Sequence, residues 1–212
     1  MDNLYKLFEK IKIIPVVTIE NSEDAEPLAE ALITGGLPCA EITFRTDAAA
    51  EVIRGLSGRK DILIGAGSVL HTEQAKLALD CGAKFVVSPG FNPKVVQYCE
   101  QQKLPVTPGV CTPSEFTLAL EYGLSILKFF PAEALGGLST LKAMSAPFPM
   151  LKFIPTGGIS PENITNYLKC KQVLACGGSW MVKKELLREK KFRQILQLVK
   201  EAVDLVSQLK PL

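Results

Sequence analysis

The chain has 212 residues, 47% of them hydrophobic and 22% charged, and a formal net charge of +2. A chain of this length can bury a sizeable core without disulfides, and single α/β barrels commonly reach it. Basic residues alternate with acidic ones, which excludes the charge stripe of a nucleic-acid-binding protein and the basic face of a membrane-surface helix. We therefore expect neither nucleic acid nor a membrane among its partners.

The cysteines and the first residues indicate a cytoplasmic protein. The six cysteines include no CxxC pair and lie mostly in apolar stretches, which is typical of reduced core residues. Met1–Lys6 carries acidic and polar side chains where a signal peptide would need an apolar core. No apolar run is long enough to span a bilayer.

Strand and helix patterns alternate along the chain. Buried strands are predicted at residues 13–18, 39–43, 61–65, 84–87, 105–107, around Lys128, at 151–155 and at 173–175. Helices are predicted at Leu4–Ile11, after the starting signals Asn21-Ser22, Thr46, Thr72, Asn92-Pro93 and the capping box Thr112–Glu115, and through residues 192–206.

Eight strands alternating with helices predict the α/β class, with a parallel sheet closed into a single (β/α)8 TIM barrel and an extra N-terminal helix. An open doubly wound sheet is the alternative. It is weakened because Thr18-Ile19-Glu20 stands where a GxGxxG fingerprint would follow the first strand. No linker or composition shift divides the chain, so the predicted domain is residues 1–212, one barrel with the catalytic site.

Metal chemistry is not expected. His71 is the only histidine, and acidic residues do not cluster as a Mg²⁺ site would require. His71 precedes the helix start at Thr72 and is interpreted as a surface residue. Catalysis would then use lysine, carboxylate, arginine and hydroxyl groups.

Lys128 is the one charged residue in the apolar run Ile126–Pro131. If the run is a buried strand, the amine is held away from water, and a neutral amine in a dry pocket attacks carbonyls to form a Schiff base. The alternatives are an ion pair with a neighbouring strand or a stem that reaches the rim. Lys152 also lies in an apolar strand, but near its start, and we assign it a structural ion pair.

In a barrel the active site lies at the C-terminal ends of the strands. Glu41 and Thr43 share one face of their strand, and Arg45 continues that parity into the loop. A glutamate and a lysine that face one mouth suit proton transfer during Schiff-base chemistry, whereas a charge-neutralising pair is the alternative. The planar fork of Arg45 suits a substrate carboxylate, or else a salt bridge at the rim.

Two glycine pairs, Gly157-Gly158 and Gly177-Gly178, stand at the ends of the last two predicted strands. Phosphate sites in barrels are commonly built there from backbone N–H groups, and Ser179 can add a hydroxyl donor. Tight turns that require glycine are the alternative explanation.

Six segments carry a family resemblance, in this order: Glu41–Thr46, Gly65–Leu70, Ser88–Gly90, Lys128–Glu133, Pro155–Ser160 and Gly177–Trp180. Together they resemble the 2-keto-3-deoxy-6-phosphogluconate (KDPG) aldolase family, which includes the bifunctional 4-hydroxy-2-oxoglutarate (KHG) aldolases. The resemblance covers nearly the whole chain.

The resemblance implies a metal-independent class I aldolase, a carbon–carbon lyase that cleaves KDPG to pyruvate and glyceraldehyde 3-phosphate. Cleavage of KHG to pyruvate and glyoxylate would be a second reaction. Lys128 would be the Schiff-base lysine and Glu41 the general acid/base, with no cofactor besides the covalent link to substrate. Such enzymes are commonly homotrimers of the Entner–Doudoroff pathway.

The same resemblance implies the substrate-binding residues. Arg45 and Ser68 would hold the carboxylate end and Pro89 would line the pocket. The residues implied around the rest of the substrate and its phosphate are Thr156, Gly157, Gly158, Gly178 and Ser179. Ser68 stands where threonine is expected, and Cys111-Thr112-Pro113 replaces a more hydroxyl-rich loop. Both departures bear on the identity of the substrate.

Three alternatives stay open at this point. One is an aldolase for the galactonate epimer, which rates on both epimers would separate. Another is a phosphosugar isomerase or epimerase that uses Glu41 as base and Lys128 only as a charge; release of pyruvate would separate it. The third is a non-catalytic sugar-phosphate-binding barrel, for which a ligand would bind without turnover.

Overall fold

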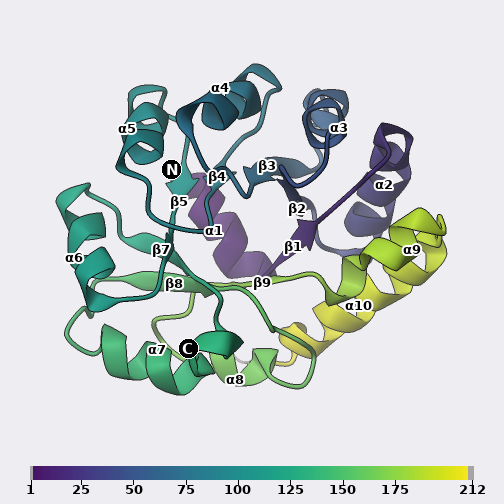
Figure 1. Cartoon of the computed structure of the whole chain (residues 1–212). Helices are drawn as coiled ribbons and strands as arrows, with labels where there is room; N and C mark the ends of the chain where they lie inside the picture. The colour runs from purple at the N-terminus through teal and green to yellow at the C-terminus, as the bar shows by residue number, and fades with distance from the viewer. Residues whose placement is uncertain (1, 210–212) are drawn as a thin grey trace.

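The computed structural model describes residues 2–209, with side chains from Leu4 onward. Met1 and residues 210–212, at the ends of the predicted domain, lie outside the described residues. Strands alternate with helices along the chain, and the paired strands of the described part run parallel. The predicted α/β class is therefore confirmed, and the sheet is strongly curved (Figure 1).

The strands form two sheets with adjacent edges. In the described chain they are β1 (Ile13–Val17), β2 (Cys39–Thr43), β3 (Leu63–Gly67), β4 (Val86–Val87), β5 (Val106–Thr107), β6 (Gly109–Val110), β7 (Ile126–Phe129), β8 (Lys152–Pro155) and β9 (Cys176–Gly178). Within residues 2–209 one sheet has six strands, in the order β5-β4-β3-β2-β1-β9, and the other has three, β6-β7-β8. Only Pro108, which has no N–H to donate, separates β5 from β6. A bridge between Thr156 and Gly177 brings β8 beside β9.

The helices lie around the outside of the strands, except the first helix of the chain, which Figure 1 shows at the centre of the view. They are α1 (Asp2–Ile11), α2 (Ala25–Gly35), α3 (Ala49–Leu56), α4 (Thr72–Asp80), α5 (Pro93–Gln101), α6 (Pro113–Glu121), α7 (Gly137–Ser145), α8 (Ile164–Leu168), α9 (Lys184–Arg188) and α10 (Phe192–Ser207), with short 3₁₀ turns η1 (Ser22–Asp24), η2 (Glu133–Leu135) and η3 (Trp180–Val182). α10 packs against α2, and a Cβ on Gly35 would overlap Val199. In residues 2–209 no helix combines the length and apolar character needed to cross a bilayer.

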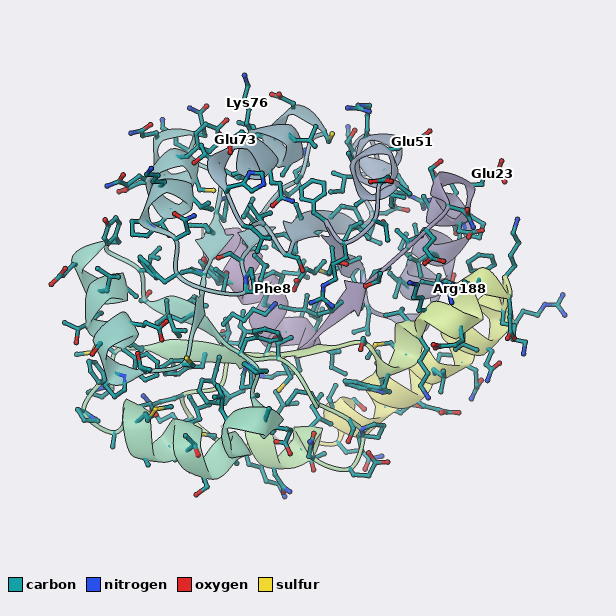
Figure 2. The ribbon with its side chains drawn as sticks, in the orientation of Figure 1. Phe8, Glu23, Glu51, Glu73, Lys76 and Arg188 are labelled. Carbon is teal, nitrogen blue, oxygen red and sulfur yellow. The ribbon has the colours of Figure 1, made fainter. Side chains whose placement is uncertain are left out.

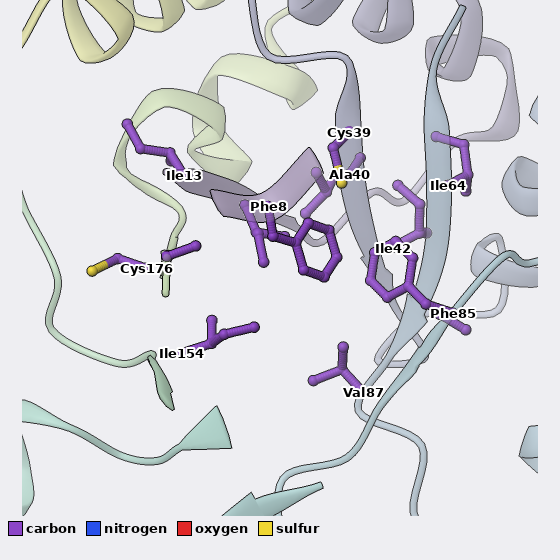
Figure 3. Packing of buried hydrophobic residues seen from close by; sticks show 14 of the residues in the cluster. Phe8, Ile13, Cys39, Ala40, Ile42, Ile64, Phe85, Val87, Ile154 and Cys176 are labelled. Atoms are coloured by element: carbon purple, nitrogen blue, oxygen red, sulfur yellow. The ribbon is translucent and has the colours of Figure 1, made fainter. Parts of the chain in front are cut away.

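The expected N-terminal helix, α1, fills one end of the space enclosed by the strands. It ends just before β1 begins, so it lies where the strands start. Phe8 is fully buried and its ring meets Phe85 edge-on at 5.2 Å between centroids. Figure 3 shows both rings among side chains from several strands. Figure 2 shows Phe8 near the centre of the molecule, with charged residues such as Glu51 and Arg188 on the outer helices.

Several strands are one or two residues shorter than predicted, and two strands, β3 and β9, are shifted along the chain. β3 lies two residues later than the predicted strand at 61–65, because Gly67 pairs with Thr43 of β2. The last strand, predicted at 173–175, lies entirely after that range, at Cys176–Gly178, because these residues pair with β1, whereas Val173 forms only an isolated bridge with Phe153. Strands are predicted from side chains that alternate between apolar and polar. Glycine has no side chain, so this alternation could not show where the two strands end.

Helix starts follow the predicted capping chemistry at two of the expected positions. The Asn92 side chain accepts a hydrogen bond from the first turn of α5 at 3.0 Å, and the Thr112 hydroxyl accepts one from the first turn of α6 at 3.3 Å. The predicted cap at Thr46 is wrong. Its hydroxyl donates instead to the Ile19 carbonyl at 2.6 Å, and α3 begins three residues later.

Glu20, just after β1, links the first strand to α9. Arg188 Nε and Lys184 Nζ each lie 2.6 Å from a carboxylate oxygen of Glu20. The hydrogen bond from Arg188, followed by the one from Lys184, lowers the pKa of Glu20 from 4.5 to about 2. The ionised carboxylate is therefore favoured in the folded state.

We expect Glu20→Gln to lower stability at neutral pH but not in strong acid. Since the folded pKa of Glu20 is about 2 and its ordinary value is 4.5, its contribution is present above pH 4.5 and is lost as pH falls towards 2. Thermal unfolding between neutral pH and pH 2.5 measures the difference in Tm between the variant and the unaltered protein, which we call the Tm gap. A gap that stays constant down to the acid limit would contradict this. Glu51→Gln is the control, because Glu51 is exposed and has no ion pair within residues 2–209.

Candidate functional site

Glu41 of β2 and Lys128 of β7 face each other inside the curved sheet. Lys128 Nζ lies 3.4 Å from Glu41 Oε1, and the two residues are 4% and 3% exposed. Water therefore screens neither charge. Removing one partner of such a pair leaves a buried charge uncompensated, which costs about 3–5 kcal/mol in typical proteins.

Gly67 of β3 makes room for the Glu41 carboxylate. A Cβ at this position would overlap Oε1 and Cγ of Glu41 and lie 2.7 Å from its Cδ. Only glycine allows the carboxylate to lie where it meets Lys128. Gly67 lies beyond the strand predicted at residues 61–65, and no role was predicted for it. One feature of the sequence could have indicated this role. Gly67 is two residues after Gly65 and so faces the same side of the strand, and a glycine in a strand often marks a place where another group approaches the backbone closely.

The surroundings of Lys128 differ from those of Lys152, the other lysine in an apolar strand. Lys128 Nζ lies 5.1 Å from the centroid of the Phe130 ring, a face that attracts cations. Lys152 Nζ donates to the Lys171 carbonyl at 2.7 Å. The ion pair predicted for Lys152 is not formed among the described residues.

Arg45 and Ser68 meet beyond the ends of β2 and β3. Arg45 Nε donates to Ser68 Oγ at 3.0 Å. Ser68 has a φ of 54°, the left-handed region, which is uncommon outside glycine. Its hydroxyl is thus held beside the guanidinium, and the two could receive one anionic group together.

Pro89 lies beside the strand that neighbours Lys128. Its carbonyl group packs against Gly109 of β6 so closely that a Cβ on Gly109 would overlap it. Gly109 in turn pairs with Lys128. Pro89 is therefore near the lysine through one intervening strand, on the side towards β4.

The chain turns sharply at the end of β8, at Thr156, Gly157 and Gly158, a segment that we call the glycine turn. Thr156 is 7% exposed, and the two glycines have φ values of 96° and 80°. Among the described residues, the N–H groups of Gly158 and Ile159 donate to no protein acceptor, whereas Gly157 directly follows the bridge from Thr156 to Gly177. Successive free N–H groups in such a turn form a concave site suited to an anion.

Gly178 and Ser179 lie on the neighbouring strand end. The bridge from Thr156 to Gly177 brings the end of β9 beside the glycine turn. Ser179 is exposed and directly precedes η3. The sites proposed for the two glycine pairs thus adjoin, although the pairs are separated by about 20 residues in the sequence.

A separate cavity lies away from this site. It has a volume of about 980 Å³ and is lined by residues of α1, β8 and α10, among them Ile11, Lys152 and Val206. It is thus at the end where the strands begin, and none of the predicted site residues lines it. In the described chain, no three His, Cys, Asp or Glu side chains group as metal ligands.

Comparisons with known proteins point to one family. The family model for KDPG and KHG aldolase matches residues 4–198. A 2-dehydro-3-deoxy-phosphogluconate aldolase of Treponema pallidum is 47% identical over 208 residues, which cover 98% of this chain and 99% of the relative.

Two solved structures agree closely with this fold. The KDPG aldolase of Legionella pneumophila, with pyruvate captured as a covalent carbinolamine intermediate, has a TM-score of 0.90 and 39% identity and covers 93% of this chain and 97% of its own. The Zymomonas mobilis KDPG aldolase with 3-phosphoglycerate has a TM-score of 0.90 and 37% identity, covering 96% of each chain. Because sequence and structure match over nearly the full length, the chain belongs to the KDPG and KHG aldolase family.

Proposed function

We propose that the protein is a class I aldolase that cleaves KDPG to pyruvate and glyceraldehyde 3-phosphate through a Schiff base on Lys128. The buried Lys128–Glu41 pair, 3.4 Å apart, carries this proposal. It combines an amine shielded from water with a carboxylate close enough to move protons around it. The family relatives, one of them holding pyruvate as a carbinolamine, support the same chemistry.

The reaction begins when the Lys128 ammonium passes a proton to Glu41, and the neutral amine then attacks the C2 carbonyl of KDPG and forms a carbinolamine. Glu41 supplies a proton to the C2 oxygen, which leaves as water, and the C2–nitrogen double bond of the Schiff base forms. A base, for which Glu41 is the nearest candidate, then removes the C4 hydroxyl proton. The C3–C4 bond breaks, its electrons pass to the C2–C3 bond of an enamine, and glyceraldehyde 3-phosphate leaves. Protonation at C3 and hydrolysis of the Schiff base release pyruvate.

The rim residues would orient the substrate. Arg45 and Ser68, already hydrogen-bonded to each other, would bind the carboxylate, and Pro89 would line the wall beside Lys128's strand. The residues proposed for the opposite end are Thr156, Gly157, Gly158, Gly178 and Ser179. The free N–H groups of the glycine turn support a phosphate there.

The substrate preference follows from the relatives and from the glycine turn. The relatives are KDPG aldolases, which favours the gluconate over the galactonate epimer. KHG has no phosphate but has the same keto acid end, so the pair of Lys128 and Glu41 would act on it too. The reaction needs no resident cofactor because the lysine itself supplies the electron-withdrawing imine. It would serve the Entner–Doudoroff pathway.

The complete architecture would be one closed (β/α)8 barrel. β5 and β6 would count as one strand interrupted at Pro108, and the bridge at Thr156 would join β8 to β9. Buried side chains form one cluster from Leu4 to Val206, which supports a single domain over residues 1–212.

Location and assembly are further parts of the proposal. All six cysteines are free, as expected for a cytoplasmic protein. A homotrimer is proposed from the family resemblance, and the exposed apolar side chains of Leu70 and Leu77 at α4 offer one contact surface.

The direct test is reduction with borohydride in the presence of pyruvate, followed by mass spectrometry of the intact protein and its peptides. We expect one reduced adduct, on the Lys128 peptide. Lys128→Met should abolish the adduct and lower cleavage on the order of 10⁶-fold, the scale typical of removing a covalent nucleophile. Lys152→Met is the matched control and should still form the adduct. Undiminished cleavage by folded Lys128→Met protein would refute the mechanism.

Glu41→Gln keeps the shape of the side chain and removes its capacity to exchange protons. We expect kcat to fall by roughly 10²–10⁴-fold, the usual range for a general acid/base, while KM changes little. Steady-state kinetics on KDPG measures both. A raised KM with nearly unchanged kcat would instead make Glu41 a binding residue.

Gly67→Ala should displace the Glu41 carboxylate from Lys128, because the added methyl group would occupy its place. A displacement of about 1 Å typically costs on the order of 10²-fold in rate, so we expect a fall in kcat of that size. Gly55→Ala is the control, since a Cβ at Gly55 meets nothing within 4 Å. Equal kcat values for the two variants would show that the carboxylate tolerates a side chain at position 67.

A further inference from the structure

The glycine turn after β8 is held from the outside by a hydrogen-bonded pair of side chains. Tyr167 of α8 donates from its hydroxyl to Glu133 Oε1 in η2. Tyr167 is 1% exposed, whereas Glu133 lies at the surface. Burial, with the bond to Glu133 next in size, raises the pKa of Tyr167, so the phenol keeps its proton and remains a donor.

Glu133 also contacts the turn directly. Its backbone N–H donates to the Gly157 carbonyl at 3.0 Å. Its Cβ and Cγ lie 2.6 and 2.7 Å from the position that a Cβ on Gly158 would occupy, so the stem of Glu133 covers that glycine. The carboxylate of Glu133 accepts the hydrogen bond from Tyr167. Gly137 leaves room for this carboxylate, because a Cβ on Gly137 would lie 2.8 Å from Glu133 Oε1.

A second contact holds the next carbonyl. Asn163, just before α8, donates from Nδ2 to the Gly158 carbonyl at 2.9 Å and accepts from the Ser160 N–H at 2.9 Å. The Gly157 and Gly158 carbonyls are thus both occupied by donors. The N–H groups of Gly158 and Ile159 have no acceptor among the described residues and are left for a ligand.

We propose that Glu133 and Tyr167 are positioning residues that hold the Gly157-Gly158 turn in the conformation that receives the substrate phosphate. This rests on the proposed aldolase function and deepens it. Gly157 and Gly158 both have φ values near 90°. Glycine can adopt several other backbone conformations as readily, so contacts from other residues are needed to hold this one. The pair supplies that support by joining the segment after β7 to the helix after β8.

The test compares binding of KDPG, which has both a phosphate and a keto acid end, with binding of pyruvate, which has only the keto acid end. Tyr167→Phe removes only the hydroxyl, and we expect KM for KDPG to rise about tenfold, the usual effect of losing one hydrogen bond to a charged group. The pyruvate concentration that gives half-maximal borohydride trapping at Lys128 should stay within about twofold, because pyruvate has no phosphate. Tyr122→Phe is the matched control, since the Tyr122 hydroxyl makes no hydrogen bond within the described residues.

Glu133 provides a second, independent pair of variants. Glu133→Gln retains an acceptor oxygen for Tyr167 and should keep KM for KDPG within about threefold. Glu133→Ala should raise it as Tyr167→Phe does. Glu133 is exposed, so these variants test the idea even if the change at the buried Tyr167 prevents folding.

Each outcome has one meaning. A rise confined to KDPG supports the pair as positioning residues. Equal losses for KDPG cleavage and pyruvate trapping, or no loss in Glu133→Ala, would overturn that role while leaving the aldolase function intact. Failure of the unaltered protein to form a pyruvate adduct would instead overturn the proposed function, and the inference with it.

Discussion

The ion pair between Glu41 and Lys128 is the interaction on which the rest of the site depends. Two opposite charges buried to this extent lose most of their hydration, and they are tolerated only when they meet in good geometry. Because of this requirement, Glu41 of β2 and Lys128 of β7 must both face the inside of the sheet. The carboxylate also needs free space beside it. Gly67 supplies this space. The chemistry follows from the same constraint, because a shielded amine next to a proton carrier is suited to form a Schiff base.

Glycines with distinct spatial roles build the surroundings of this pair. On β3, Gly65 leaves room for the Phe85 ring and Gly67 for the Glu41 carboxylate, so one strand serves both the packed core and the site. At the end of β8, Gly157 and Gly158 adopt positive φ values, and the N–H groups of Gly158 and Ile159 stay free for an anion. In each case the missing side chain is what permits a neighbouring group to take its place.

The two ends of the strands are used differently. At the end where strands begin, α1 inserts Phe8 against Phe85 and contributes to the packed core. At the opposite end, short connections carry Arg45, Ser68 and the glycine turn, held by side-chain contacts rather than by a continuous apolar core. Stability and ligand contact are thereby separated along the strand direction, as is usual in parallel α/β proteins.

The sequence by itself determined the alternation of strands and helices, the helix starts at Asn92 and Thr112, and the candidate lysine and glutamate, because these depend on local periodicity, capping and a charge inside an apolar run. Only the tertiary structure decided that Glu41 meets Lys128 across 87 residues, that Lys152 bonds a carbonyl instead of a carboxylate, and where β3 and β9 end. It also decided the contacts of Gly67 and of the Glu133–Tyr167 pair. Those features depend on strand pairing and close packing between distant segments, and a glycine or a lone polar residue carries no local pattern that specifies its distant neighbour.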